Sequence, residues 1–271
     1  MKRRPVQRWS FGNIVGMPII CAGLLFMAAA QIARASPGAR AHDPRQLVQQ
    51  YLAAAGVAGL RAAHTRSCLG SIALAPSGLS AGKGVEPFQG RLELDWKEPG
   101  RAREVRTSAT DKIRRITDGE HGWEVGNKQA RRALRVLERV ELSRLGALYQ
   151  PALVLALDEL AYSHSDKVGE RPAFVLKSPS GELLWLDQET HLPLRLDLWV
   201  ERADSEHSGE FYLSQILFED WQPVAAGSAV KLPRTIRRVL AQASLVYQLD
   251  EIKQDTELAD SLFKIPYFWR R

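Results

Sequence analysis

The sequence is poor in cysteine, with only Cys21 and Cys68 among its 271 residues. The cleavage predicted below removes Cys21, and one remaining cysteine forms no internal disulfide. A small secreted scaffold held together by disulfides is therefore excluded, and stability has to come from a hydrophobic core. We expect Cys68 to be a small buried strand residue.

Catalytic signatures are also missing. The sequence contains no H-E-x-x-H, Walker or G-x-G-x-x-G motif, and its one G-x-S-x-G match, residues 78–82 (GLSAG), lies in a loop rich in glycine, serine and proline. Two short pairs, Glu120-His121 and His164-x-Asp166, supply two metal ligands each, which is fewer than a zinc site needs. We therefore expect a protein that is not an enzyme and that holds no cofactor or metal.

Positive charge is scarce outside the first segment. The formal net charge is +6, but residues 1–35 hold five basic and no acidic residues, which leaves 32 basic against 31 acidic residues in the remainder. A nearly neutral body argues against nucleic acid as a partner.

Only one long stretch lacks charge, the 17 residues from Ile14 to Ala30. It is shorter than the roughly 20 residues of a membrane-spanning helix. A basic start, Lys2-Arg3-Arg4, precedes it, and Ala33-Arg34-Ala35 follows with the small residues that signal peptidase requires. We predict a signal peptide over residues 1–35, cleavage before Ser36 and a periplasmic location; an uncleaved inner-membrane anchor is the alternative.

Helices are expected in two places. After a flexible leader over 36–42, Asp43-Pro44 is an N-cap acid followed by proline at the first helical position, and Gly56 is a stop signal, with a short second piece over 57–63. A second helix is predicted over 132–149, before Pro151, and a short apolar one over 152–160. The apolar stripe predicted for the helix over 132–149 consists of Leu134, Leu137, Val140, Leu145 and Leu148.

The rest of the chain has the period-two pattern of strands. Leu92, Leu94 and Trp96 alternate with charged residues, as Val105 and Thr107 alternate with Glu104 and Arg106. Further strands are predicted over 174–176, 183–186, 192–200, 210–221, 230–240 and 244–252. In the clearest of them, one face carries Leu192, Leu194, Leu196, Leu198 and Val200, and the other carries Pro193, Arg195, Asp197, Trp199 and Glu201.

One apolar and one polar face are typical of an antiparallel sheet, and consecutive strands without helices between them exclude parallel β-α-β units. We therefore predict an α+β fold and a single domain over 43–271.

Several local phrases follow in order along this pattern: 118–125 (DGEHGWEV), 168–175 (VGERPAFV), 184–195 (LWLDQETHLPLR), 230–237 (VKLPRTIR) and 260–263 (DSLF). With the strand pattern, they resemble the outer-membrane lipoprotein-sorting family, the LolA-like superfamily of periplasmic carriers, over roughly 43–266. The resemblance implies a half-open β-barrel, in which helices cover the concave apolar face of a curved antiparallel sheet and acyl chains occupy the space between.

On that basis the expected ligand cavity is lined by Leu92, Leu94, Trp96, Leu192, Leu194, Leu196, Leu198 and Val200, and the stripe from Leu134 to Leu148 forms a helical lid. Alternation alone does not distinguish such a cavity from a packed core. The expected function is to carry lipid or lipoprotein acyl chains, together with a membrane-bound delivery or signalling partner. The alternative is a periplasmic sensor or partner-binding module with exposed aromatics on its convex face; Trp199 with Phe211 or Trp221 are the candidates.

Overall fold

The computed structural model describes residues 42–76, 88–127, 131–201, 211–239 and 243–264. The predicted signal peptide, its cleavage site, the leader up to Ala41 and most of the long loop before Phe88 lie outside the described residues. Among those that are described, no helix is long and apolar enough to cross a membrane.

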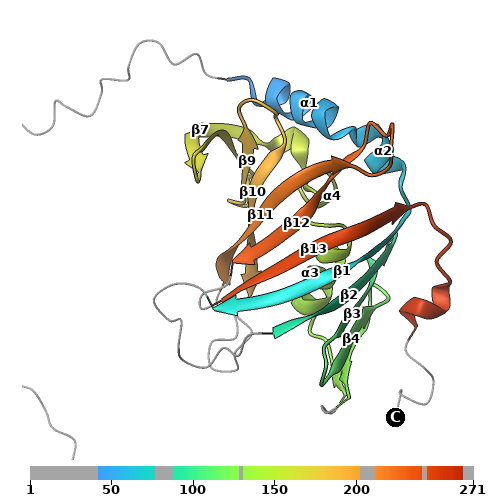
Figure 1. Cartoon of the computed structure of the whole chain (residues 1–271). Helices are drawn as coiled ribbons and strands as arrows, with labels where there is room; N and C mark the ends of the chain where they lie inside the picture. The colour runs from blue at the N-terminus through green and yellow to red at the C-terminus, as the bar shows by residue number, and fades with distance from the viewer. Residues whose placement is uncertain (1–41, 77–87, 128–130, 202–210, 240–242, 265–271) are drawn as a thin grey trace, which may run out of the picture. The chain divides into compact units, whose positions relative to one another are not determined.

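The described strands form one curved antiparallel sheet that does not close into a barrel (Figure 1). Its order is β6-β5-β4-β3-β2-β1-β13-β12-β11-β10-β9-β8-β7, so the first and last strands of the chain pair at the centre of the sheet. The predicted α+β fold with a curved antiparallel sheet is confirmed. The strands are β1 (Thr65–Pro76), β2 (Phe88–Lys97), β3 (Arg101–Thr107), β4 (Lys112–Thr117), β5 (Gly122–Gly126), β6 (Arg132–Ala133), β7 (Ala161–Val168), β8 (Arg171–Lys177), β9 (Leu183–Asp187), β10 (Pro193–Glu201), β11 (Phe211–Pro223), β12 (Lys231–Val239) and β13 (Ala243–Gln254).

Helix α1 (Pro44–Ala55) begins and ends where the sequence predicts. The Asp43 carboxylate accepts the Arg45 N–H at 3.0 Å, and Gly56 ends the helix with φ +68°. Only glycine fits there, because a Cβ would also collide with the Ala229 carbonyl between β11 and β12. Helix α2 (Val57–Ala62) follows at once, so the N-terminal helices sit on the β11–β12 turn.

The helix predicted over 132–149 is shorter than expected. Its first two residues pair with β5 as the short edge strand β6, and helix α3 covers only Val136–Gly146. The segment predicted as a helix over 152–160 contains one turn, α4 (Pro151–Val154), and a 3-10 turn, η2 (Leu157–Glu159). Helices α3 and α4 lie inside the curve of the sheet (Figure 1). A second 3-10 turn, η3 (Asp260–Phe263), ends the described chain.

Most buried apolar side chains on the helix-covered face belong to one cluster, called the main cluster below. It joins α1, the residues after α3 and strands from both halves of the sheet. Its larger members include Leu47, Val48, Tyr51, Cys68, Ile72, Leu92, Leu94, Leu145, Leu148, Tyr149, Leu184, Leu186, Leu192, Leu196, Leu198, Ile216, Phe218, Leu232, Ile236, Tyr247, Leu249 and Ile252.

Candidate functional site

Five of the eight residues predicted to line a cavity lie in the main cluster: Leu92, Leu94, Leu192, Leu196 and Leu198. All are buried, and Leu196 is 0% exposed. A side chain without accessible surface borders no space large enough for water. These leucines are therefore packed against their neighbours in this structure, and a ligand reaches them only if some of those neighbours move.

Trp96 is also buried on the helix-covered face, but in a second cluster with Leu134, Leu142 and Ala147. Leu142 belongs to α3 and Ala147 follows directly after it. Trp96 is therefore the residue of the predicted cavity set that packs against the helix expected to form the lid.

Leu194 does not join the other leucines of β10. The pairing of β10 with β9 shifts register between Pro193 and Arg195, and Leu194 packs in a third cluster with Ala173, Val175 and Trp185. The prediction that Leu194 faces the helices is wrong, because the irregularity interrupts the strict alternation of the strand. Val200, near the end of the same strand, is only half-buried.

The opposite face of β10 is less exposed to solvent than predicted. Asp197 is 3% exposed, and both of its oxygens accept hydrogen bonds from Arg195, at 2.7 and 2.6 Å. The Arg195 guanidinium in turn lies 4.1 Å from the ring centroid of Trp185. This face therefore carries a stacked ion pair in place of solvated charge.

The predicted lid stripe is not one buried face. Leu145 and Leu148 lie in the main cluster and Leu134 lies beside Trp96, but Leu137 is half-buried and Val140 is 40% exposed. The correction follows from the helix ends, because Leu134 precedes α3 and Leu148 follows it in a left-handed conformation with φ +56°.

Polar contacts hold α3 over the sheet. Glu141 on the helix pairs with Arg238 of β12 at 2.9 Å and also accepts the Tyr149 hydroxyl. Burial, followed by the charge of Glu141, raises the pKa of the Tyr149 phenol well above its usual value. At the other end of the helix, Glu138 pairs with Arg132 at 2.9 Å.

Strand β3 turns Glu104 and Arg106 toward the helices, and the apolar Val105 is buried on the opposite face. Glu104 lies opposite Leu94 and is 0% exposed. It pairs with Arg106 at 2.7 Å and with Arg115 at 3.3 Å. Burial raises the pKa of Glu104, but the two arginines together outweigh burial and lower it. The covered face therefore combines apolar side chains with buried ion pairs, and strand β3 contributes to both through Ala102 and Glu104.

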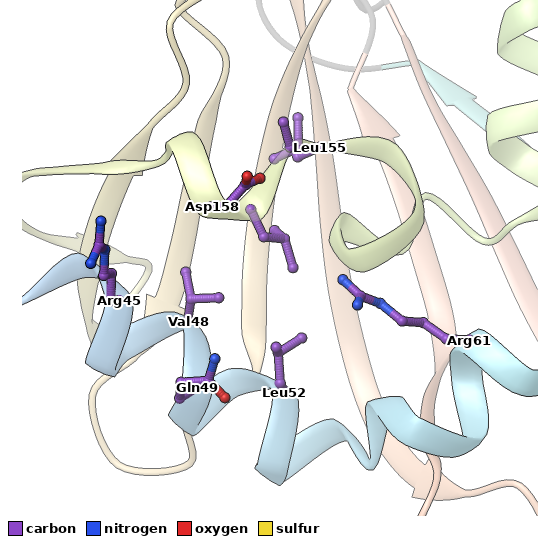
Figure 2. Close-up of a pocket in the computed structure, with 9 residues that line it drawn as sticks. Arg45, Val48, Gln49, Leu52, Arg61, Leu155 and Asp158 are labelled. Carbon is purple, nitrogen blue, oxygen red and sulfur yellow. The ribbon is translucent and has the colours of Figure 1, made fainter.

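A pocket of about 650 Å³ opens between α1, α2 and the segment around η2. Figure 2 shows Val48 and Leu52 projecting from α1 toward that segment, with Arg61 reaching in from α2 and Arg45 at the other end. The lining residues are Arg45, Val48, Gln49, Leu52, Arg61, Leu155, Ala156, Leu157 and Asp158. Four of them (Val48, Leu52, Leu155 and Leu157) belong to the main cluster or pack against it, so the pocket borders the core directly.

A second pocket, of about 470 Å³, lies between the β2–β3 turn, α3 and α4. It is lined by Trp96, Glu98, Pro99, Gly100, Ser143, Arg144, Ala147, Leu153 and Val154. The segment from Leu153 to Asp158 thus contributes to both pockets. Both volumes fall in the range of about 300–1,000 Å³ that small-molecule sites occupy.

Sequence reasoning predicted none of the residues of the larger pocket, because they come from three elements whose proximity is tertiary. The described residues contain no group of three or more histidine, cysteine, aspartate or glutamate side chains arranged to hold a metal ion. The carboxylate of Asp187 is used in the turn after β9, where it accepts the Thr190 N–H at 2.7 Å.

No family model and no curated protein matches this chain. Several solved structures do match it. A LolA superfamily protein from Nitrosomonas europaea matches with TM-score 0.50 at 12% identity, over 83% of this chain and 99% of that one. A DUF1329 family protein from Desulfovibrio piger matches with TM-score 0.49 at 13% identity, over 82% and 98%. A domain named for outer membrane lipoprotein sorting, from Vibrio parahaemolyticus, matches with TM-score 0.45 at 10% identity, over 82% and 97%.

The first of these similarities confirms the predicted resemblance to the LolA-like superfamily in fold. At 12% identity it shows the fold alone.

Proposed function

We propose that this protein is a carrier that shields the acyl chains of a lipid or lipoprotein from water. The observation that carries the proposal is the 650 Å³ pocket, whose apolar wall is continuous with the main cluster. Each methylene that moves from water into such surroundings gains about 0.8 kcal/mol, so a long chain binds without any catalytic group.

The segment between α3 and β7 is the part that would move to admit a longer chain. Its residues line both pockets, and its only α-helical stretch is the four residues of α4. Leu148 and Tyr149, at its start, are both in the left-handed region, with φ of 56° and 50°. Such a conformation costs a leucine or tyrosine about 1–3 kcal/mol, which a rearrangement of the segment would release.

The proposed location is the periplasm, where a carrier of acyl chains has to cross an aqueous space. It rests on the basic start, the uncharged run and the Ala33-Arg34-Ala35 triplet of the sequence. An inner-membrane anchor formed by the same run is the alternative. A membrane-bound partner that delivers or receives the lipid completes the proposal.

The first experiment is mass spectrometry of organic extracts from natively purified protein, and a co-purifying acyl lipid is the expected result. The second uses Leu52→Trp, which places a large side chain in the pocket from a half-buried position. We expect it to weaken binding of a fluorescent fatty acid with little loss of stability. Val140→Trp is the matched control, because Val140 is an exposed residue of α3 that lines neither pocket. Unchanged binding by Leu52→Trp contradicts the pocket assignment.

A second candidate function is a sensor or partner-binding module on the same fold. The observation that favours it is the exposure of Trp199 (39%) and Phe211 (59%) on the face of β10 and β11 away from the helices. Trp221 is not part of this exposed face, because it packs against the main cluster and its indole donates to the Pro193 carbonyl at 3.0 Å. A lipid-free extract together with a membrane protein that is captured by wild type but not by Trp199→Ser would favour this candidate.

A further inference from the structure

Arg66 on β1 is a charged side chain enclosed within the protein. It is 0% exposed and lies between Trp96 of β2 and Gln254 of β13 in the sheet. Cys68, two residues further along the same strand, belongs to the main cluster. Arg66 therefore points toward the helix-covered face.

The donors of Arg66 have no acceptors. Its Nε, Nη1 and Nη2 atoms are buried without a hydrogen-bond partner, as is Nε2 of the neighbouring Gln254. A guanidinium presents five N–H donors in a planar fork. The ring of Trp96, 5.6 Å from the guanidinium carbon, offers only a cation–π contact, which offsets a small part of the cost of burying a charge.

No described carboxylate bonds to Arg66, although the charge of Asp255 favours its charged form. Asp255 accepts the backbone N–H of His64 at 3.1 Å, and Asp95 pairs with Arg103 at 2.5 Å. A second cation adds to the positive charge, since Arg234 of β12 also leaves Nε and Nη1 buried without partners. Burial raises the pKa of Cys68 to about 12, and the charges of Arg66 and Arg234 oppose that rise.

Trp96 borders both Arg66 and a pocket. Its indole stacks near the guanidinium and also lines the 470 Å³ pocket, together with Leu153 and Val154 of the segment around α4. Arg66 itself is 0% exposed, so a ligand in that pocket reaches its donors only if side chains such as Trp96 move.

We propose that Arg66, assisted by Gln254, binds the anionic oxygens at the end of an acyl ligand. The chemistry is that of a carboxylate or phosphate, either of which a guanidinium fork binds through two parallel hydrogen bonds. The inference rests on the proposed carrier function and adds a requirement that the carrier function alone does not make: the bound chain carries a negative group.

The test compares oleate with oleyl alcohol, which has the same chain without the charge. Hydrogen bonds to a charged group predict that wild type binds oleate about 10- to 100-fold more tightly. Arg66→Met should bind the two equally, with the affinity for the alcohol unchanged, and Arg66→Lys should keep part of the preference. Arg91→Met, an exposed arginine on β2, is the matched control and should behave as wild type.

Two further ligands identify the source of the anion. Tighter binding of lysophosphatidic acid than of oleate assigns a lipid phosphate, whereas Arg66-dependent binding of inorganic phosphate alone supports the site for a soluble anion. Thermal melts of the ligand-free protein give an independent readout. Arg66→Met should raise Tm, because it removes a buried charge that has no partner.

Equal binding of oleate and oleyl alcohol by wild type overturns the anion site and leaves the carrier function standing. Binding of neither ligand overturns both proposals. A lower Tm for Arg66→Met, with the preference for oleate retained, shows that Arg66 has a structural role only and also overturns the inference.

Discussion

Leu196 provides a direct measure of how solid the helix-covered face is. It lies in β10, is 0% exposed and belongs to the main cluster. Leu196→Ala removes three carbons, which costs about 2–3 kcal/mol in lost burial. The space left behind raises the total to about 3–5 kcal/mol if the surroundings do not collapse. Leu196→Glu places an unpaired carboxylate there, at a cost comparable to the whole stability of a domain, and should prevent folding.

The assay is urea unfolding followed by tryptophan fluorescence and circular dichroism. Leu69 of β1 is the matched control, because it is also a strand leucine but is 46% exposed. Leu69→Ala should cost about 1 kcal/mol or less, and Leu69→Glu should still fold. A folded Leu196→Glu protein would refute the reasoning, since it would mean that this side chain borders a hollow large enough for water.

Three other predictions concern polar contacts. Asp197→Ala should destabilise the protein by about 1–3 kcal/mol in urea unfolding, because it removes a buried carboxylate and leaves the partly exposed Arg195 without its ion-pair partner. A change within experimental error would contradict the stacked ion pair. Glu141→Gln and Tyr149→Phe should be non-additive by about 0.5–3 kcal/mol in a double-mutant cycle, since both residues contribute to one contact that holds α3; additive effects would argue against that contact. Acid should destabilise the fold from about pH 4.5 downward, because the folded-state pKa values of Glu104 and Asp187 lie below their usual values of 4.5 and 3.8. The stability that the two carboxylates contribute is complete above the usual values and is lost as the pH falls through the lower folded-state pKa values. Glu104→Gln should make this pH dependence of the free energy of unfolding shallower.

The parts of the fold that the sequence predicts well are those that local signals determine. Helix α1 has its cap acid, its first-turn proline and its terminal glycine within 14 residues, from Asp43 to Gly56. The strands from β8 to β13 also follow directly from their alternation, whereas β7 (Ala161–Val168) was not predicted. Each of these features depends on neighbours in sequence, so the pattern is sufficient.

Predictions failed where a tertiary contact overrides the local pattern. Arg132 and Ala133 have a helical pattern but pair with β5, and the register shift before Arg195 turns Leu194 away from the other leucines. Alternation did not indicate that Glu104 is buried, because its burial depends on the ion pairs with Arg106 and Arg115.

The candidate site was the least predictable part. Both pockets combine residues from elements far apart in the chain, such as Leu52 with Leu157 and Trp96 with Val154. One signal for Arg66 was present in the sequence, since it lies two residues before Cys68 in a strand whose apolar face includes that cysteine. A charge on the apolar side of a strand indicates either a buried ion pair or a place for an external anion.

The pairing of β1 with β13 has a consequence for the order in which the molecule assembles. It joins residues far apart in sequence, from Arg66 with Gln254 to Pro76 with Ala243. Just beyond β13, the Thr65 hydroxyl donates to the Thr256 carbonyl, 191 positions away. The hairpins on either side form from local contacts, but the pairing of β1 with β13 at the centre of the sheet forms only after β13, the last strand, is in place. Until then both half-sheets present an unpaired backbone edge, so folding should be slow and prone to aggregation at that stage. Deleting the residues of β13 would therefore separate the two half-sheets, whereas deleting the two-residue edge strand β6 would shorten the sheet by its smallest member.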